Sequence, residues 1–382
     1  MPYDWFSHLR EHDPVHWQEV PGQPGYWALT RHEDVVHVSR HPELFSSYRG
    51  TSMLPEQDEE GLARNRMIML NQDPPEHTRH RRLVNRGFTP RAIGHLEKHI
   101  TEICDGLIDE VAARGEADFV TDIAAQLPLY VICELLGVPP EDRCKIFAWS
   151  NALVGFDDPE YAQERMSSMG ALYAYAGEQA AKRRRDPRDD LITTLLEPDA
   201  DGEELGPGEF EMFVLMLAVA GNETTRNAAS GGMLALIEHP DQWARLVNDE
   251  VPAGTAAEEI VRWVSPIIQF RRTAQADTEI RGQRIAEGEK VVVYYPAANR
   301  DPRVFTGPGA FDLGRDPNPH VGFGGGGPHF CLGAHLARME LAVLFRALAA
   351  RMPDIRPAGE VRRLRSNFIN GIKEMPVRFT AA

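Results

Sequence analysis

Cys331 has the surroundings of a reactive cysteine in this chain of 382 residues. Four consecutive glycines (Gly324–Gly327) precede it, and apolar residues recur at helical spacing from Leu332 to Leu348, so a helix is predicted directly after it. Glycine reaches backbone conformations closed to other residues, which lets the chain fold tightly around the sulfur. The first turn of a helix carries partial positive charge and unpaired N–H groups, which favour a thiolate. The sequence therefore predicts a loop thiolate, which is a soft metal ligand.

Such a thiolate can ligate haem iron, but three other interpretations of the same residues compete with that one. The spacing of Gly322, Gly324 and Gly327 matches the dinucleotide-binding fingerprint, although a proline follows where the motif's helix should open and no acidic residue is suitably placed downstream. A zinc site is conceivable, but the chain lacks the CxxC pair typical of structural zinc. Its ligands would be Cys331, His320, His329 and His335. An inert buried cysteine is the third interpretation, and these residues alone leave it open.

A second group of polar side chains interrupts an apolar helix predicted over Glu209–Ile237. The segment Ala220-Gly221-Asn222-Glu223-Thr224-Thr225 places an acid beside an alcohol. Glycine in a helix costs about 1 kcal/mol relative to alanine, and threonine hydroxyls can bond back to carbonyls and bend the helix. The segment is either a surface-facing turn or a locally opened helix that presents Glu223 and Thr224 to a ligand.

A third group places Glu259 and Arg262 three residues apart on one predicted helix face. Taken alone, such a spacing predicts a surface ion pair worth a few tenths of a kcal/mol.

Composition and the cysteines limit the function classes. The net charge of −16 argues against nucleic acid as a partner. Four cysteines without framework spacing (Cys104, Cys133, Cys144 and Cys331) indicate a reducing compartment. The N-terminus has no signal-peptide pattern, and the longest apolar stretch, Phe213–Ala220, is too short for a membrane span. We therefore expect a cytoplasmic protein without a membrane span.

The elements that must position these groups are mostly helical, with small sheets at the periphery. Helices are predicted over Ile93–Val111, Ile123–Leu136, Arg143–Val154, Glu164–Arg183, Leu191–Leu196 and Glu209–Ile237. Strand-like runs are Tyr26–Leu29, Val35–Val38, Thr278–Gln283 and Lys290–Tyr295. A long irregular stretch, 299–327, leads to the cysteine. We expect a single domain over 1–382, with a β-leaning part at about 1–75 and a helical body at about 76–265 and 332–352.

Taken together, the motifs resemble the cytochrome P-450 superfamily, in its soluble bacterial form, over essentially the whole chain. The motif around Glu223 and Thr224, the Glu259–Arg262 pair, Arg315 in Phe311–Arg315 and the Cys331 loop follow the family's order and spacing. The resemblance implies a mainly α fold shaped as a triangular prism, with small peripheral sheets. It places haem b between the long central helix and the helix after the cysteine.

The resemblance also implies roles for individual residues. Cys331 would be the proximal ligand of the haem iron, and Glu223 and Thr224 would deliver protons to bound dioxygen. A buried ion network would brace the cysteine loop, formed by Glu259, Arg262 and Arg315. The remaining cofactor-binding residues would be His77, Arg81, Arg272, His329, Ala220, Gly221 and Phe323. Of these, His77, Arg81, Arg272 and His329 would hold the haem propionates.

Partners and substrate follow from the same resemblance. The chain has no flavin or iron–sulfur motif, so electrons would come from a ferredoxin and its reductase, and Arg79, Arg82 and Arg86 are candidate docking charges. A hydrophobic small molecule would share an apolar pocket with dioxygen. Candidate lining residues, each more often a core residue when considered alone, are Met67, Ile68, Met69, Leu70, Val154, Leu217, Ile267, Ile268, Phe368 and Ile369.

One feature narrows the branch of the family. Phe323 stands eight residues before Cys331, one more than in the common loop. With the segments 220–227 and 370–373, this loop resembles that of actinobacterial hydroxylases of sterol side chains and methyl-branched lipids. We expect a monooxygenase that hydroxylates a terminal methyl of such a substrate. A terpenoid or secondary-metabolite hydroxylase is the alternative within the fold. A non-catalytic haem-thiolate sensor is the alternative outside it, and the acid–alcohol pair argues against a sensor.

Overall fold

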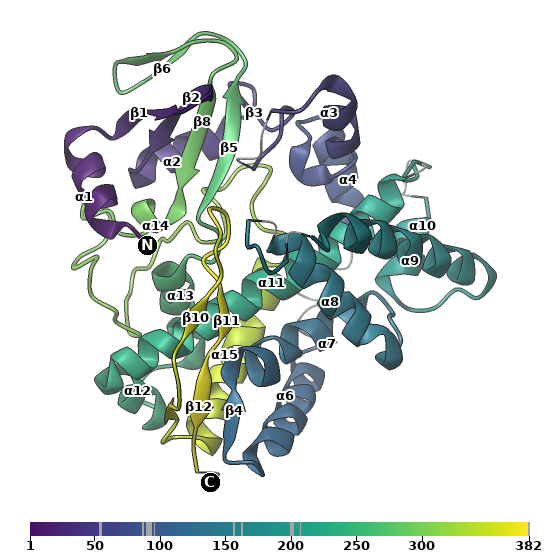
Figure 1. The fold of residues 1–382 in the computed structure, drawn as a ribbon, viewed down its shortest axis with the longest axis vertical. Coiled ribbons are helices and arrows are strands. Elements are labelled where there is room, and N and C mark those ends of the chain that lie inside the picture. The colour runs from purple at the N-terminus through teal and green to yellow at the C-terminus, as the bar shows by residue number, and fades with distance from the viewer. Residues whose placement is uncertain are drawn as a thin grey trace. The chain divides into compact units, whose positions relative to one another are not determined.

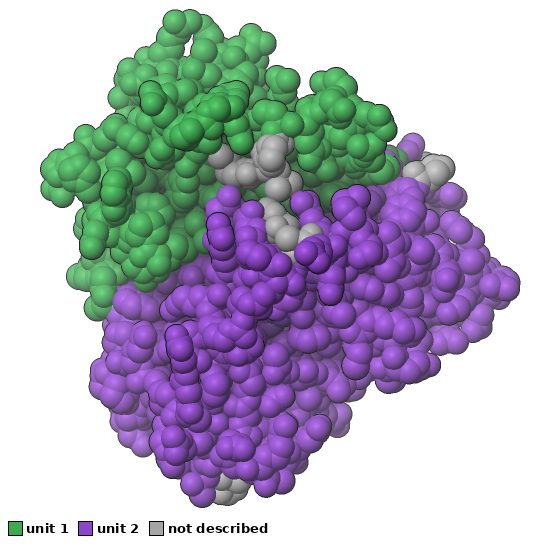
Figure 2. All heavy atoms as spheres, in the orientation of Figure 1, with its two compact units in different colours: residues 1–82, 267–310, 317–332 green, residues 83–266, 311–316, 333–382 purple. Residues whose placement is uncertain are grey.

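The computed structural model describes residues 1–52, 56–85, 88, 94, 96–155, 157–161, 163–198, 202–206 and 208–380. Contacts divide the chain into two compact units, coloured separately in Figure 2. Unit 1 comprises Met1–Arg82, Ile267–Ala310 and Pro317–Leu332, and unit 2 comprises Leu83–Pro266, Phe311–Asp316 and Gly333–Ala382. The expected single domain over 1–382 stays a prediction.

Unit 1 is built on a five-stranded sheet with the strand order β1-β2-β8-β5-β3 (Figure 1). The β2–β8 pair is parallel and the other neighbours are antiparallel. The strands are β1 (Val15–Val20), β2 (Gln23–Leu29), β8 (Lys290–Tyr294), β5 (Gln269–Ala274) and β3 (Phe45–Ser46), with a separate hairpin of β6 (Thr278–Ile280) and β7 (Gln283–Ile285). The helices are α1 (Tyr3–His12), α2 (His32–Arg40), α3 (Glu59–Asn65), a 3-10 turn (Met69–Asn71), α14 (Tyr295–Ala298) and α4 (Glu76–Asn85), whose residues from Leu83 on belong to unit 2.

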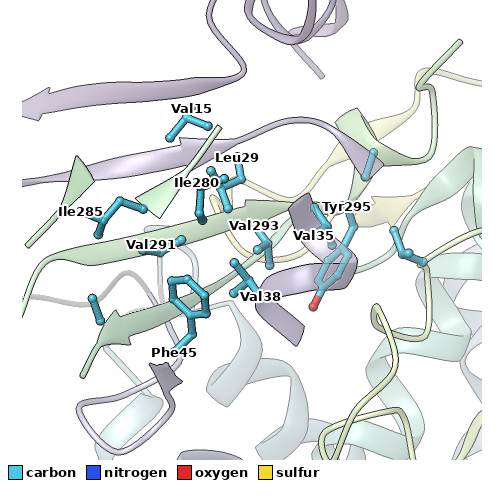
Figure 3. Close-up of a cluster of buried hydrophobic side chains, with 13 residues drawn as sticks. Val15, Leu29, Val35, Val38, Phe45, Ile280, Ile285, Val291, Val293 and Tyr295 are labelled. Carbon is cyan, nitrogen blue, oxygen red and sulfur yellow. The ribbon is translucent and has the colours of Figure 1, made fainter. Parts of the chain in front are cut away.

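The core of unit 1 lies between this sheet and α2, as Figure 3 shows. Val35 and Val38 are buried against sheet residues such as Val293. The prediction of a strand over Val35–Val38 was therefore wrong. Two valines three residues apart share one face of a helix, and packing of that face against the sheet outweighs the preference of β-branched residues for strands.

Unit 2 is mainly helical, and its long helix α11 (Glu209–Glu238) packs most extensively on five of the other helices. Those five are α7 (Gln126–Leu135), α8 (Arg143–Val154), α9 (Arg165–Arg185), α13 (Ala253–Val264) and α15 (Ala334–Arg351). The remaining segments are α6 (Glu97–Ala112), a π-helical turn (Phe119–Ala124), a 3-10 turn (Pro140–Asp142), α10 (Leu191–Leu196) and α12 (Pro240–Val247).

Two small sheets complete unit 2. One strand, β4, comes from the first part of the unit, and the other four come from the C-terminal segment of the chain. The strands are β4 (Glu116–Asp118), β12 (Pro376–Arg378) and β9 (Arg356–Pro357) in one sheet, and β10 (Arg362–Arg363) and β11 (Ile372–Glu374) in the other. The predicted fold class, mainly α with small sheets, is confirmed. Among the described residues, no helix is long and apolar enough to cross a membrane.

Candidate active site

The glycine-rich loop in unit 1 closes on itself just before the cysteine. The Cys331 amide donates to the carbonyl oxygen of Phe323 at 2.9 Å, and the Phe330 amide donates to that of Gly327 at 3.2 Å. Gly324, Gly326 and Gly327 have φ values of +100°, +90° and +74°, which side chains rarely adopt. The half-buried Cys331 lies three residues before the first residue of α15.

The same loop packs closely on the backbone of α2, which explains why glycines follow one another. A Cβ atom on Gly327 would lie 2.1 Å from the carbonyl oxygen of Ser39. A Cβ atom on Gly325 would lie 2.9 Å from the carbonyl oxygen of Val35. Sequence reasoning missed this contact, because it assigned the segment around Val35 to a strand.

Two histidines and two arginines gather near the loop within unit 1. The buried ring of His77, on α4, lies with its centroid 4.1 Å from that of His329. Arg81 Nη1 donates to the Pro328 carbonyl oxygen at 3.0 Å, and Arg272 on β5 donates to the carbonyl oxygen of Arg271 at 2.8 Å. The structure thus brings together all four of the residues predicted to hold the propionates.

The electrostatics of this cluster favour an anionic ligand. Burial, with Arg81, His80 and Arg272 nearby, lowers the pKa of His77 to about 4. Burial and the neighbouring Arg272 lower the pKa of His329 to about 2, so both rings are neutral. Burial also lowers the pKa of Arg81, and the charge of a Cys331 thiolate opposes that shift.

Several donors in the cluster are unused. Neither Arg81 nor Arg272 forms a salt bridge with a described residue, and Arg272 is buried. Both ring nitrogens of His77 are buried and make no hydrogen bond within the described part of the chain. Buried polar groups are normally paired. The cluster therefore has the charge and the donors to hold carboxylates.

In unit 2, α11 runs without interruption through the acid–alcohol segment. The prediction of a locally opened helix was wrong, because intrahelical and neighbouring groups satisfy the polar side chains. Thr224 Oγ1 donates to the Ala220 carbonyl oxygen at 2.8 Å. Gly221 is closely packed, since a Cβ atom there would lie 3.1 Å from the Ile132 side chain. Ala220 is exposed and Thr224 is half-buried, in the middle of a mostly buried helix.

Glu223 is buried, with only 1% of its surface exposed, and faces α8. Its carboxylate forms an ion pair with Arg226 and accepts from Ser150 Oγ and Asn222 Nδ2, each at 3.3 Å. Burial raises the pKa of Glu223, and Arg226 and Ser150 oppose that shift. Sequence reasoning missed Arg226, although it stands three residues after an acid, as Arg262 does.

The third group is fully buried in unit 2, which the spacing alone did not indicate. Arg262 makes a two-pronged contact with Glu259, with Nε–Oε2 and Nη2–Oε1 distances of 2.7 Å, and neither side chain is exposed. Arg315 Nε donates to Glu259 Oε2 at 3.1 Å, and the Asp312 amide donates to Oε1 at 2.9 Å. A surface pair was thus the wrong expectation. That this network braces the cysteine loop stays a prediction.

The segment 370–373 is bonded to α11 and to the end of α13. Asn227 Oδ1 accepts from the Ile372 amide at 3.2 Å, and Asn370 Nδ2 donates to the Val264 carbonyl oxygen at 2.6 Å. Gly371 lies so close to Asn227 that a Cβ atom would be 3.1 Å from Oδ1. Asn227 and the segment 370–373, both used to choose the branch of the family, therefore form one structural feature.

The candidate pocket residues occur in both units. Ile267 packs against the sheet core of unit 1, while Met69, Leu217 and Ile369 are buried. Half-buried candidates are Met67, Ile68, Leu70, Ile268 and Phe368. The Val154 side chain and all of Arg86 lie outside the described residues. Their roles in substrate and partner binding stay predictions.

Solved structures with the same architecture are cytochromes P450. The Mycobacterium marinum cytochrome P450 CYP268A2 in complex with pseudoionone is 41% identical, with a TM-score of 0.92 over 99% of this chain and 94% of that one. P450BioI in complex with hexadec-9Z-enoic acid ligated acyl carrier protein is 33% identical, with a TM-score of 0.91 over 99% of this chain and 98% of that one.

Curated relatives agree with the structural neighbours. Steroid C26-monooxygenase from Rhodococcus jostii (strain RHA1) is 48% identical over 391 residues, which cover 100% of this chain and 83% of that protein. Methyl-branched lipid omega-hydroxylase from Mycobacterium tuberculosis (strain ATCC 25618 / H37Rv) is 44% identical over 388 residues, which cover 98% of this chain and 90% of that protein. The Cytochrome P450 family model matches residues 255–350. The chain belongs to the cytochrome P450 family, and it is a monooxygenase with a haem cofactor.

The residues of unit 1 fit this cofactor. Haem carries two propionate carboxylates, and the cluster of Arg81, Arg272, His77 and His329 offers two guanidiniums and the ring nitrogens of His77, which have no partner in the described part of the chain. Cys331 stands in a loop beside Arg81, where its thiolate would be available to the haem iron. Burial instead raises the pKa of Cys104 and of Cys133 to about 12, which keeps those two thiols protonated.

Proposed function

We propose that this monooxygenase hydroxylates the terminal methyl of a sterol side chain or a methyl-branched lipid. The supporting observation is that two curated relatives, a steroid C26-monooxygenase and a methyl-branched lipid omega-hydroxylase, match nearly the whole chain at 48% and 44% identity. Both names describe oxidation at the end of a branched hydrocarbon chain. An apolar channel would hold such a chain lengthwise, since each buried CH₂ contributes about 0.8 kcal/mol.

We further propose how individual residues serve the reaction. Thiolate-ligated haem supplies the chemistry of dioxygen activation when bound. Cys331 ligates the iron, and the propionates are held by His77, Arg81, Arg272 and His329, while Ala220, Gly221 and Phe323 contact the cofactor. Thr224 is half-buried, and its hydroxyl can exchange the Ala220 carbonyl for a ligand.

Glu223 is the proposed proton donor. Burial raises the pKa of Glu223 toward neutral pH. A general acid is most effective when its pKa lies near the working pH. Its partners Arg226 and Ser150 fix the carboxyl group on the α8 side of α11. Electrons would come from a ferredoxin and its reductase, with Arg79 and Arg82 as docking charges, and a cytoplasmic location is part of the same proposal.

A binding titration with product analysis tests the substrate class. Cholest-4-en-3-one and phytanic acid should convert the ferric protein to high spin and yield terminal alcohols with a surrogate ferredoxin system. Androst-4-ene-3,17-dione, which keeps the steroid rings but has no side chain, is the matched control and should bind weakly. Equal binding and turnover of the control, or hydroxylation on the rings, would refute the proposal.

A terpenoid hydroxylase is the second candidate. The structural neighbour with pseudoionone, a terpenoid ketone, favours it at 41% identity. Linalool belongs in the same titration for this reason. A product from linalool and none from cholest-4-en-3-one or phytanic acid would select the terpenoid function.

A further inference from the structure

A small pocket, with a cavity volume of about 70 Å³ and a lining of polar and apolar residues, lies inside unit 2 beside the proposed proton donor. Glu223 and Arg226 of α11 line its inner part. Other lining residues used below are Thr121, Asn151, Tyr161, Leu364 and Lys373. All of them belong to unit 2, and of the residues named here only Glu223, Arg226 and Lys373 lie in the segments singled out in the sequence.

Arg226 occupies a distinctive position in this pocket. Its side chain is 10% exposed, and its Nη2 and Nη1 atoms bond Glu223 Oε2 and Asn151 Oδ1. The Nε atom of Arg226 is buried and has no hydrogen-bond partner in the described part of the chain. A buried N–H group normally has a partner, which can be an ordered water where the cavity is polar and large enough. The guanidinium therefore has a donor left for water in the pocket.

The pocket continues from Arg226 toward solvent through further polar groups. Lys373 Nζ lies 2.9 Å from Asp158 Oδ2 and 2.9 Å from Glu160 Oε1, and the Glu160 side chain is 51% exposed. Tyr161, Thr121 and Asn151 also line the pocket, and each carries a polar side-chain group of a kind that water can bond. A buried water needs two to four such partners, and this lining offers them.

We propose that this pocket is the route by which solvent protons reach Glu223, and that Arg226 is the positioning residue that holds the carboxylate at its inner end. The inference rests on the proposed role of Glu223 in proton delivery and adds its path and its counter-ion. Arg226 does not touch the reacting atoms in this scheme. It acts by fixing the carboxylate and by keeping its charged form accessible, so that Glu223 can give up a proton and regain one.

The charged groups around Glu223 decide the expected pH effect. Arg226 is the cation on its own helix, and Lys373 faces the pocket from β11 with Asp158 and Glu160 beyond it. Tyr161 faces it from the α8–α9 connection, and Ser150 of α8 is a neutral partner. A cation within about 4–6 Å lowers a carboxyl pKa by about 1–3 units. Loss of the Arg226 charge should therefore let Glu223 keep its proton to a higher pH.

The first test is an infrared titration of the ferric holoenzyme. The carbonyl band of the protonated Glu223 carboxyl is assigned as the band missing in E223Q. In R226Q its titration midpoint should move up by about 1–3 pH units, and R226K, which keeps the charge, should restore the wild-type midpoint. An unchanged midpoint in R226Q would overturn the role of Arg226.

The second test fills the pocket. Leu364 is one of its lining residues, whereas the neighbouring Arg363 is exposed, so L364W should fill the route and R363W is the matched control. After transfer to D₂O, the Glu223 band should lose its fast hydrogen–deuterium exchange in L364W and keep it in R363W. L364F serves if L364W does not fold. Fast exchange in the filled variants would overturn the route.

The amount of product formed per electron consumed distinguishes this inference from the proposed role of Glu223 in proton delivery, on which it rests. If E223Q forms as much product per electron consumed as the wild type, the proton-delivery role of Glu223 fails. If E223Q lowers that ratio while R226Q and L364W match the wild type, only the inference about the pocket and Arg226 fails. A lowered ratio in all three, recovered in R226K, supports both.

Discussion

Replacement of Gly327 by alanine should disrupt the cysteine loop more than any comparable change nearby. Gly327 has a φ of +74°, and a left-handed conformation costs a residue with a Cβ atom about 1–2 kcal/mol. The added Cβ atom would also lie 2.1 Å from the Ser39 carbonyl oxygen, which belongs to the backbone of α2. Relief of such an overlap typically costs about 1–3 kcal/mol. G327A should therefore destabilise the protein by about 2–5 kcal/mol.

Two other glycines of the same region separate these contributions. Gly324 also has a positive φ, +100°, but an added Cβ atom would meet its nearest atoms at an ordinary 3.8 Å, so G324A should cost only about 1–2 kcal/mol. Gly309 has no positive φ and nothing within 4 Å of an added Cβ atom, so G309A should stay within about 0.5 kcal/mol.

Denaturant unfolding of the ferric holoenzyme, followed by haem absorbance and by circular dichroism, measures all three variants. The fraction of protein that forms the thiolate carbon monoxide band reports on the loop itself. The order of stability should be G309A, then G324A, then G327A. A G327A variant as stable as G324A would refute the packing of the loop on α2.

Three further predictions concern other buried groups. E259A removes the buried carboxylate that bonds the Arg262 and Arg315 guanidiniums and should cost about 3–5 kcal/mol in equilibrium unfolding, whereas E258A breaks a half-buried pair worth about 1 kcal/mol or less; equal losses would contradict the network. Burial raises the pKa of Glu340 from 4.5 to about 8, so the folded state binds the proton more tightly and stability is lost as pH rises through this window, by up to about 5 kcal/mol. E340Q should lose less stability than the wild type over that range in unfolding experiments, and equal losses in the two proteins would refute the shift. T224A should still bind substrate and accept electrons, but product per electron should fall about 10²-fold with peroxide released instead; unchanged coupling would exclude the proposed role of Thr224.

Helices with strong apolar periodicity were predictable from the sequence. The bounds Arg143–Val154 and Leu191–Leu196 coincide with α8 and α10, and the long helix ends one residue beyond its predicted end. The segment around Val35 was not predictable in the same way, because its helical state depends on a sheet formed by distant strands. The close contact between the glycine loop and α2 was hidden for the same reason.

Some features of the candidate site were also predictable from the sequence and others were not. The motifs that carry chemistry, around Cys331, Glu223 and Glu259, could be located from residue types and spacing. Burial could not be inferred from spacing, which by itself predicted a surface pair for Glu259, whereas the family resemblance implied a buried network; both side chains of the pair are fully buried. Arg226 was missed because an Arg three residues after a Glu is common on exposed helix faces. Only the structure shows that this pair is buried and lines a pocket.

The carbon monoxide spectrum of the reduced protein tests the central assignment most directly. Cys331 stands in the glycine loop beside Arg81, whereas burial keeps Cys104 and Cys133 protonated. C331S should lose the band typical of thiolate-ligated haem, while C104S, C133S and C144S should keep it. Retention of that band in C331S, or its loss in one of the other three, would contradict the account.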